Sequence, residues 1–156
     1  MVMMIVAIIA GFGVPSFTQF IREGELTSRA NSALIALQLA RSEAISRGQP
    51  VMACPSTDGS SCNGTNWADG WLVATDSGGS AGSVDTGDGD QILRVSSTDT
   101  QLNSDGPEFV RFTSDGLNAN DDNRLIWLER PECGTDRRRE IPVSPTGRSQ
   151  VNKADC

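Results

Sequence analysis

The sequence predicts an α+β fold, in which one long N-terminal helix packs on a small antiparallel β domain that carries two disulfides. Three observations predict it. The first 48 residues have continuous helical character and end at a Gly and a Pro. The chain then changes to short runs of β-branched and aromatic residues, separated by loops of Gly, Ser and Asp. Finally, a chain of only 156 residues carries 4 cysteines.

Residues 1–21 contain no charged side chain, and their length suits one helical crossing of a bilayer. We therefore predict that this segment is a transmembrane or filament-core helix. A secretory signal peptide is one alternative, but the basic region that should precede its apolar stretch is missing. A buried core helix is the other alternative, although the chain offers it no earlier element to pack against.

Residues 22–48 continue the helix in amphipathic form, with apolar residues at steps of three and four. The apolar side consists of Leu26, Ala30, Ala33, Leu34, Leu37, Ala40, Ala44 and Ile45, and the other side of Arg29, Gln38, Arg41, Ser42 and Arg47. Gly48 and Pro50 end the helix. A domain of about 100 residues cannot bury so long a helix, so its first half must contact lipid or other copies. A globular β domain then occupies residues 49–156.

Six short runs after Pro50 have the composition of β-strands. They are Val51–Cys54, Trp71–Thr75, Gln91–Val95, Glu108–Thr113, Arg124–Glu129 and Arg138–Val143. Apolar residues crowd together in the fourth and fifth runs, as expected for strands buried against a helix. We therefore expect an antiparallel β domain on the amphipathic half of the helix.

The cysteines are Cys54, Cys62, Cys133 and Cys156, and no two of them have CxxC spacing. Because the chain has no His, a structural zinc site would need all four cysteines at unusual spacing. Two disulfides in an oxidising compartment, such as the periplasm, are favoured over four reduced thiols. Three pairings are possible. We favour Cys54–Cys62, which closes a Gly- and Ser-rich loop, and Cys133–Cys156, which fastens the last residue to the domain.

The composition argues against an enzyme. The chain has no His, which removes the commonest general base and the base partner of a Ser or Cys nucleophile. Oxygen-rich loops at 85–90 and 118–122 lack the spacing of an EF-hand, so neither a metal ion nor a cofactor is expected. The net charge of −7 and the pI of about 4.5 argue against a protein that binds nucleic acid over its whole surface.

Positive charge is concentrated in the C-terminal tail. Residues 1–136 carry 8 basic and 18 acidic side chains, whereas residues 137–156 carry 5 basic and 2 acidic ones. Such a tail is a candidate phosphate-binding strip for double-stranded DNA. Its basic residues are Arg137, Arg138, Arg139, Arg148 and Lys153. The alternative is that these arginines lie on a strand and pair with acidic side chains. Pro142, Pro145 and Gly147 predict that the tail is exposed and non-helical.

The order of these features resembles the FimT/FimU/GspH family of minor pilins, which belong to type IV pili and to the pseudopili of type II secretion. The resemblance rests on the following stretches, in chain order: LTSRANSALIALQLARSEAISRGQPV from Leu26 to Val51, Cys54-Pro55-Ser56, Cys62, Trp67-Ala68-Asp69-Gly70-Trp71-Leu72-Val73, Phe112-Thr113-Ser114-Asp115-Gly116 and Pro145-Thr146-Gly147-Arg148. The matching stretches cover most of the chain.

The resemblance implies an assembly subunit of a type IV pilus, held in the inner membrane by one helix with a periplasmic domain, and later part of the pilus. Its partners would be major and minor pilins that contact the N-terminal helix. Two alternatives remain open. One is a DNA-binding minor pilin that takes up DNA in natural transformation, and the other is a pseudopilin of type II secretion.

Two departures from the family pattern concern the ends of the chain. Family members begin with a basic leader, a Gly-Phe cleavage junction and a Glu, none of which precedes Met1, and Ser16 stands where a Glu would follow Gly11-Phe12. A mistaken or trimmed start is therefore expected. In FimT-like members a C-terminal Gly-Arg-x-Arg motif is associated with DNA uptake. Here Gly147 and Arg148 match, but Gln150 replaces the second Arg.

Overall fold

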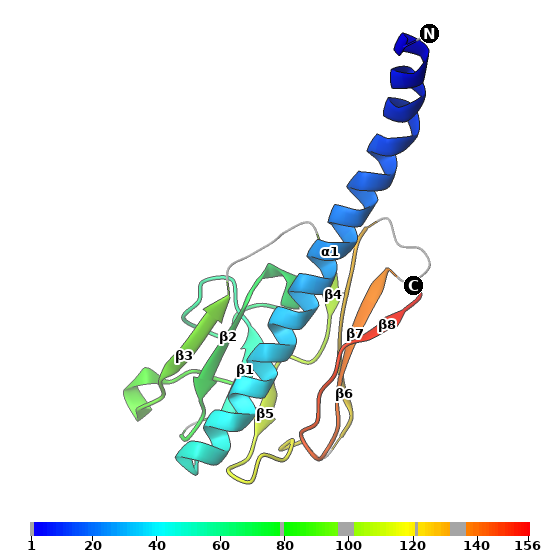
Figure 1. The fold of residues 1–156 in the computed structure, drawn as a ribbon. Helices are drawn as coiled ribbons and strands as arrows, with labels where there is room; N and C mark the ends of the chain where they lie inside the picture. The colour runs from blue at the N-terminus through cyan, green and yellow to red at the C-terminus, as the bar shows by residue number, and fades with distance from the viewer. Residues whose placement is uncertain (1, 79, 97–101, 121, 132–136) are drawn as a thin grey trace.

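The computed structural model describes residues 2–78, 80–96, 102–120, 122–131 and 137–156, and of residues 2–20 and 22 it describes the backbone alone. It contains one α-helix, α1 (Val2–Arg47), which continues far beyond the β domain toward the N-terminus (Figure 1). The helix ends where the sequence predicts, because Gly48 adopts a φ of 64° and Pro50 follows.

The predicted membrane or filament-core segment, residues 1–21, lies almost wholly outside the residues whose side chains are described. Within the described part of the chain, no helix is both long enough and apolar enough to cross a bilayer.

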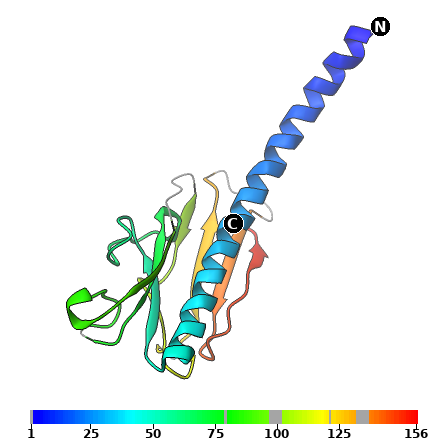
Figure 2. The ribbon, with the colours of Figure 1, turned by 60° about the vertical axis from the view of Figure 1, so that its left-hand side comes forward.

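The β domain consists of two four-stranded antiparallel sheets that lie side by side (Figure 2). Sheet A has the strand order β3-β2-β1-β5 and sheet B the order β4-β6-β7-β8. The strands are β1 (Val51–Pro55), β2 (Trp71–Thr75), β3 (Ile92–Ser96), β4 (Asn103–Asp105), β5 (Val110–Phe112), β6 (Arg124–Glu129), β7 (Arg138–Val143) and β8 (Asn152–Ala154). Two 3₁₀ turns, Trp67–Asp69 and Thr86–Asp88, lie in the loops.

All six predicted strands are present, within one or two residues of their predicted ends. Two strands, β4 and β8, were not predicted. Each has three residues, most of them polar, and each lies at an edge of sheet B, where neither burial nor alternation leaves a pattern in the sequence.

The second half of α1 lies over both sheets and completes one hydrophobic core with them. Its buried face is rich in alanine, and Ala30, Ala36, Ala40 and Ala44 are each 0% exposed. Such small side chains let the helix backbone approach the sheets closely. Sheet A contributes Val51, Ala53, Val73, Val110 and Phe112 to this core, and sheet B contributes Ile126, Leu128, Ile141 and Val143.

The predicted Cys54–Cys62 disulfide is present and joins the end of β1 to the following loop. Inside this loop the carboxylate of Asp58 accepts hydrogen bonds from the backbone of Ser60 and Ser61 and from the Ser61 hydroxyl. These bonds favour the ionised form, so they hold the pKa of Asp58 well below its usual value. The other predicted pair, Cys133–Cys156, includes Cys133, which lies outside the described residues.

Two similar turns meet near the C-terminal end of α1. In each, a hydroxyl residue, Thr113 or Ser144, accepts a backbone hydrogen bond from the glycine three residues later, Gly116 or Gly147. Arg41 of α1 joins both turns, because its Nε donates to the Gly116 oxygen at 2.9 Å and its Nη2 to the Thr146 oxygen at 3.0 Å. This joint fixes the helix against both sheets.

The joint requires a glycine at position 147. Gly147 has a φ of 74°, and a Cβ there would collide with the backbone oxygen of Gly116. We expect Gly147→Ala to lower the free energy of unfolding by about 3 kcal/mol or more, because left-handed strain adds to the displaced backbone. Gly48→Ala is the control: φ is also positive there but the space is open, so about 1 kcal/mol is expected. Equal losses in denaturant titrations would contradict the packing argument.

The hydrogen bonds of Arg41 are the second testable part of the joint. Arg41→Met retains the aliphatic stem but removes both bonds, so we expect a loss of about 1–3 kcal/mol in the free energy of unfolding. Arg148→Met serves as the matched control. Within the described part of the chain the Arg148 guanidinium makes no hydrogen bond or ion pair, so a change within about 0.5 kcal/mol is expected. Thermal unfolding of both variants distinguishes the two arginines.

Candidate functional site

The structure divides the predicted basic strip between two ends of sheet B. Arg138 and Arg139 begin β7, and Lys153 on β8 lies opposite Arg139. Arg148 lies in the turn after β7, beyond the other end of the strand. Because β7 rises about 3.3 Å per residue, the length of the strand separates the two groups by about 16 Å or more. The strip is therefore not one cluster.

Arg138 is engaged within sheet B. Its guanidinium donates to the Glu129 carboxylate at 3.0 Å, lies 4.0 Å from the Glu140 carboxylate and stacks 4.3 Å from the centre of the Trp127 ring. Two carboxylates thus offset its charge, as the alternative interpretation of the tail predicted. This environment leaves little positive potential for a phosphate group.

The expectation that the tail is exposed is wrong for Arg139. Its side chain points to the inner face of sheet B, is only 3% exposed, and donates from Nη2 to the Thr27 hydroxyl of α1 at 3.3 Å. The reason is the alternation of β7, which turns every second residue toward the helix. Arg137 is half-buried, whereas Lys153 is exposed on the edge strand β8.

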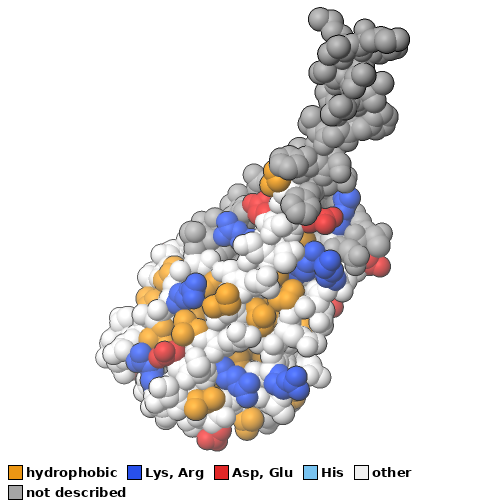
Figure 3. Space-filling view, viewed as in Figure 1, with side chains coloured by type: hydrophobic (Ala, Val, Ile, Leu, Met, Phe, Trp, Pro, Cys, Tyr) orange, Lys and Arg blue, Asp and Glu red, His pale blue; other side chains and the backbone are white. Residues whose placement is uncertain are grey.

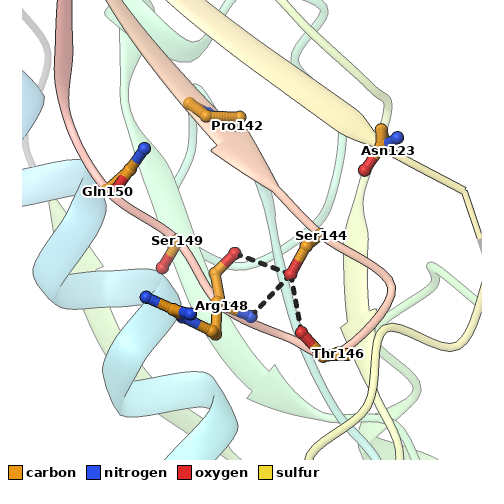
Figure 4. A pocket seen from close by; sticks show the side chains of 7 residues that line it. All are labelled: Asn123, Pro142, Ser144, Thr146, Arg148, Ser149 and Gln150. Carbon is orange, nitrogen blue, oxygen red and sulfur yellow. Dashed lines mark hydrogen bonds between the residues drawn. The ribbon is translucent and has the colours of Figure 1, made fainter.

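Arg148 is the exposed arginine of the tail, and it borders an open polar pocket of about 430 Å³ (Figure 4). The pocket is lined by Asn123, Pro142, Ser144, Thr146, Arg148, Ser149 and Gln150. Ser144 fixes the turn, because its hydroxyl accepts from the Arg148 backbone N–H at 3.1 Å. In Figure 4 the guanidinium points toward α1, away from Asn123.

A second open pocket, of about 310 Å³, lies on the α1 side of Arg148. It is lined by Gln38, Arg41, Ser42, Ile45, Gly147, Arg148 and Ser149. Among the described residues that line the two pockets, none is acidic, although the chain as a whole is acidic. Hydroxyl, amide and guanidinium donors together suit an anionic group such as phosphate or carboxylate.

The exposed face of α1 forms a second candidate surface, which we call the outer stripe. It consists of Ile21, Gly24, Ser28, Asn31, Ile35, Gln38, Ser42 and Ile45, all exposed. Arg29 and Arg41 were expected on this face, but both are half-buried beside it. Ile45 was expected on the apolar side that packs on the β domain, but it is 53% exposed on the outer stripe. Figure 3 looks onto this side of the molecule, and blue side chains lie to both sides of its white and orange middle. An exposed helix face without charge is unusual in a soluble domain.

The chain matches a family model over residues 29–147, and that family is described as type II transport protein GspH. This match includes most of the second half of α1, the strands from β1 to β7 and the joint at Arg41. A comparison with curated protein sequences finds no match.

Solved structures share the fold. The type IV minor pilin FimU of Pseudomonas aeruginosa strain PAO1 has a TM-score of 0.65 and 24% identity over 85% of this chain and 92% of FimU. The minor pseudopilin EpsH of the type 2 secretion system of Vibrio cholerae has a TM-score of 0.58 and 14% identity over 83% of this chain and 97% of EpsH. With the family match over residues 29–147, the chain belongs to the GspH family, the FimT/FimU/GspH-type minor pilins and pseudopilins.

Proposed function

We propose that the protein is a minor pilin that enters a type IV pilus through its N-terminal helix. Before assembly, the uncharged first half of the helix anchors the subunit in the inner membrane, and the β domain lies in the periplasm. In the filament the same surface packs against the helices of other major and minor pilins. Leaving lipid then costs little, because one apolar contact replaces another. The role is structural and requires no catalytic group.

The observation that carries this proposal is the length of α1 relative to the domain. The β domain covers only the second half of the helix, and the first half projects from it (Figures 1 and 2). The 21 residues that begin the chain contain no charge to solvate that projection in water. A helix of this kind is stable only among lipids or other helices.

The fold alone does not distinguish a subunit of a type IV pilus from a subunit of a type II secretion pseudopilus. FimU is a pilus subunit and EpsH a secretion subunit, and both have this fold. We favour the pilus because the similarity to FimU is the greater of the two in TM-score and in identity. A pseudopilin role is the alternative. The two roles are distinguished by whether the subunit is found in pili or in pseudopili in cells.

Charge placed in the projecting half of α1 tests the proposal. Ile9→Arg introduces a cation at a cost of about 3 kcal/mol in an apolar surrounding. We expect at least a tenfold loss of the subunit from sheared pili, measured by immunoblot against the membrane fraction. Ile92→Arg, on exposed strand β3, is the control and should be retained. Normal recovery of the Ile9→Arg subunit in pili would contradict the proposal.

A second candidate function is binding of double-stranded DNA for uptake, and the exposed position of Arg148 favours it. Arg148 borders two pockets without acidic lining residues, and Arg41 lies at the second of them. The Gly147-Arg148 pair matches the motif associated with DNA uptake, whereas Gln150 offers only neutral hydrogen bonds. Binding through these groups would be weak and independent of sequence.

A mobility-shift titration of the full chain in detergent, at 50 and 200 mM salt, tests DNA binding. We expect the wild-type chain to bind DNA more weakly at the higher salt concentration. We also expect Arg148→Gln to lower the affinity for DNA at least fivefold at low salt. Arg138→Gln is the matched control, because Glu129 and Glu140 already offset its charge, and it should change the affinity little. The same affinity for wild type and Arg148→Gln would remove Arg148 from any DNA site.

A further inference from the structure

We infer that the pocket of about 310 Å³ between α1 and the turn after β7 is a docking site for an acidic segment of a partner protein. The Arg41 and Arg148 guanidiniums bind a carboxylate of that segment. The exposed side chain of Ile45 contacts an apolar residue next to the carboxylate. The inference goes beyond filament assembly and does not rest on it, because the site lies at the far end of the β domain from the projecting half of α1.

The first argument is that two cations line one pocket without an acidic partner. Arg41 comes from α1 and Arg148 from the turn after β7, and the Arg148 guanidinium points toward α1 (Figure 4). None of the described lining residues is acidic. Glu43, two residues beyond Arg41, pairs with Arg47 at 2.6 Å instead. Two like charges at one pocket raise its positive potential, which an oxyanion relieves.

The second argument is that the structure holds both arginines in place before any ligand binds. Arg41 uses Nε and Nη2 in the joint, while its Nη1 has no hydrogen-bond partner in the described part of the chain. The Ser144 hydroxyl accepts from the backbone N–H of Arg148 at 3.1 Å, which fixes the start of that side chain. Gly147, between the turn and the helix, adds no side chain to fill the pocket. A site that is already ordered loses less entropy when it binds.

The third argument concerns the kind of anion, because the wall of the pocket is partly apolar. Ile45 lines it and is 53% exposed. Figure 3 shows blue and orange side chains close together near this end of α1. The sugar-phosphate backbone of duplex DNA has no apolar group to cover an isoleucine. A protein segment presents a carboxylate and an apolar side chain together, so it matches both parts of the wall.

The surroundings of the pocket also favour a single carboxylate over a polyanion. The other exposed cation of the tail, Lys153, lies on β8 opposite Arg139, about 16 Å or more away along β7. Duplex DNA presents a row of phosphates and needs a matching row of cations. The chain as a whole carries a net charge of −7, which repels a long polyanion more than one carboxylate.

The position of the pocket along the helix excludes a lipid headgroup as the anion. Arg41 follows Ile21, the last residue of the uncharged segment, by twenty positions. At about 1.5 Å of rise per residue, the helix places Arg41 about 30 Å beyond that segment. A membrane surface that holds residues 1–21 therefore does not reach the pocket, whereas a protein in the periplasm does.

A chemical-shift titration of the isotope-labelled full chain in detergent tests the ligand. The probe is a pool of amidated pentapeptides with a central Leu-Glu pair and varied flanking residues. We expect this pool to bind with a Kd of about 1 mM, since one ion pair and one apolar contact support only weak affinity. Matched pools with Leu-Gln or Ser-Glu should each bind at least fivefold more weakly. Equal binding of the three pools would overturn the inference.

Variants of the chain place the site. Arg148→Gln and Ile45→Ser should each weaken binding of the Leu-Glu pool at least fivefold, and both positions are exposed, so the domain should still fold. Arg138→Gln is the control for charge. Leu117→Ser is the control for apolar area, because Leu117 is 45% exposed at the equivalent position of the other turn and lines neither pocket. Wild-type affinity in Arg148→Gln or Ile45→Ser would overturn the site.

The same titration with a short DNA duplex separates the two classes of ligand. Binding of the duplex that Arg148→Gln weakens, without binding of the Leu-Glu pool, would assign the pocket to DNA and overturn the inference. Binding of the pool with the expected preferences would support it. Either result leaves the role in the pilus untouched, because retention in pili is measured separately with Ile9→Arg.

Discussion

The alanine-rich face of α1 is the surface on which both sheets pack. The main core includes strands of both sheets and the buried helix residues from Leu26 to Ala44, whereas a smaller cluster of Met52, Cys54, Leu72 and Ala74 belongs to sheet A alone. A bulkier residue at a position such as Ala36 or Ala40 would separate the helix from the sheets. The positions of the turns, of Arg41 and of the buried Arg139 all follow from this close approach.

The periodicity of the sequence predicts the helix and the longer strands because burial imposes a regular pattern on them. The same reasoning cannot find β4 and β8, whose short polar edges bury little and pair mainly through backbone atoms. The division of eight strands between two sheets depends on long-range pairing, such as β1 with both β2 and β5, which leaves no local signal. The Cys54–Cys62 loop was predictable because it is local.

The candidate surfaces were harder to predict than the fold. A run of arginines indicates positive charge, but the register of β7 decides that Arg138 meets two carboxylates and that Arg139 enters the core. Arg148 alone of these keeps an exposed guanidinium at a pocket. The helical pattern likewise gave a polar side, yet only the packed sheets show that Arg29 and Arg41 leave its centre. Charge in a sequence is therefore a poor guide to surface potential.

The contacts of Arg41 and Thr27 with β7 and its turn also determine when the domain can fold. They join residues that are 105 and 112 positions apart, so the helix meets its last partners near the end of the chain. Contacts between such distant residues form slowly. The packing of α1 on sheet B therefore cannot be complete until β7 has been synthesised, whereas sheet A, whose strands all come earlier in the chain, can pack on the helix before then.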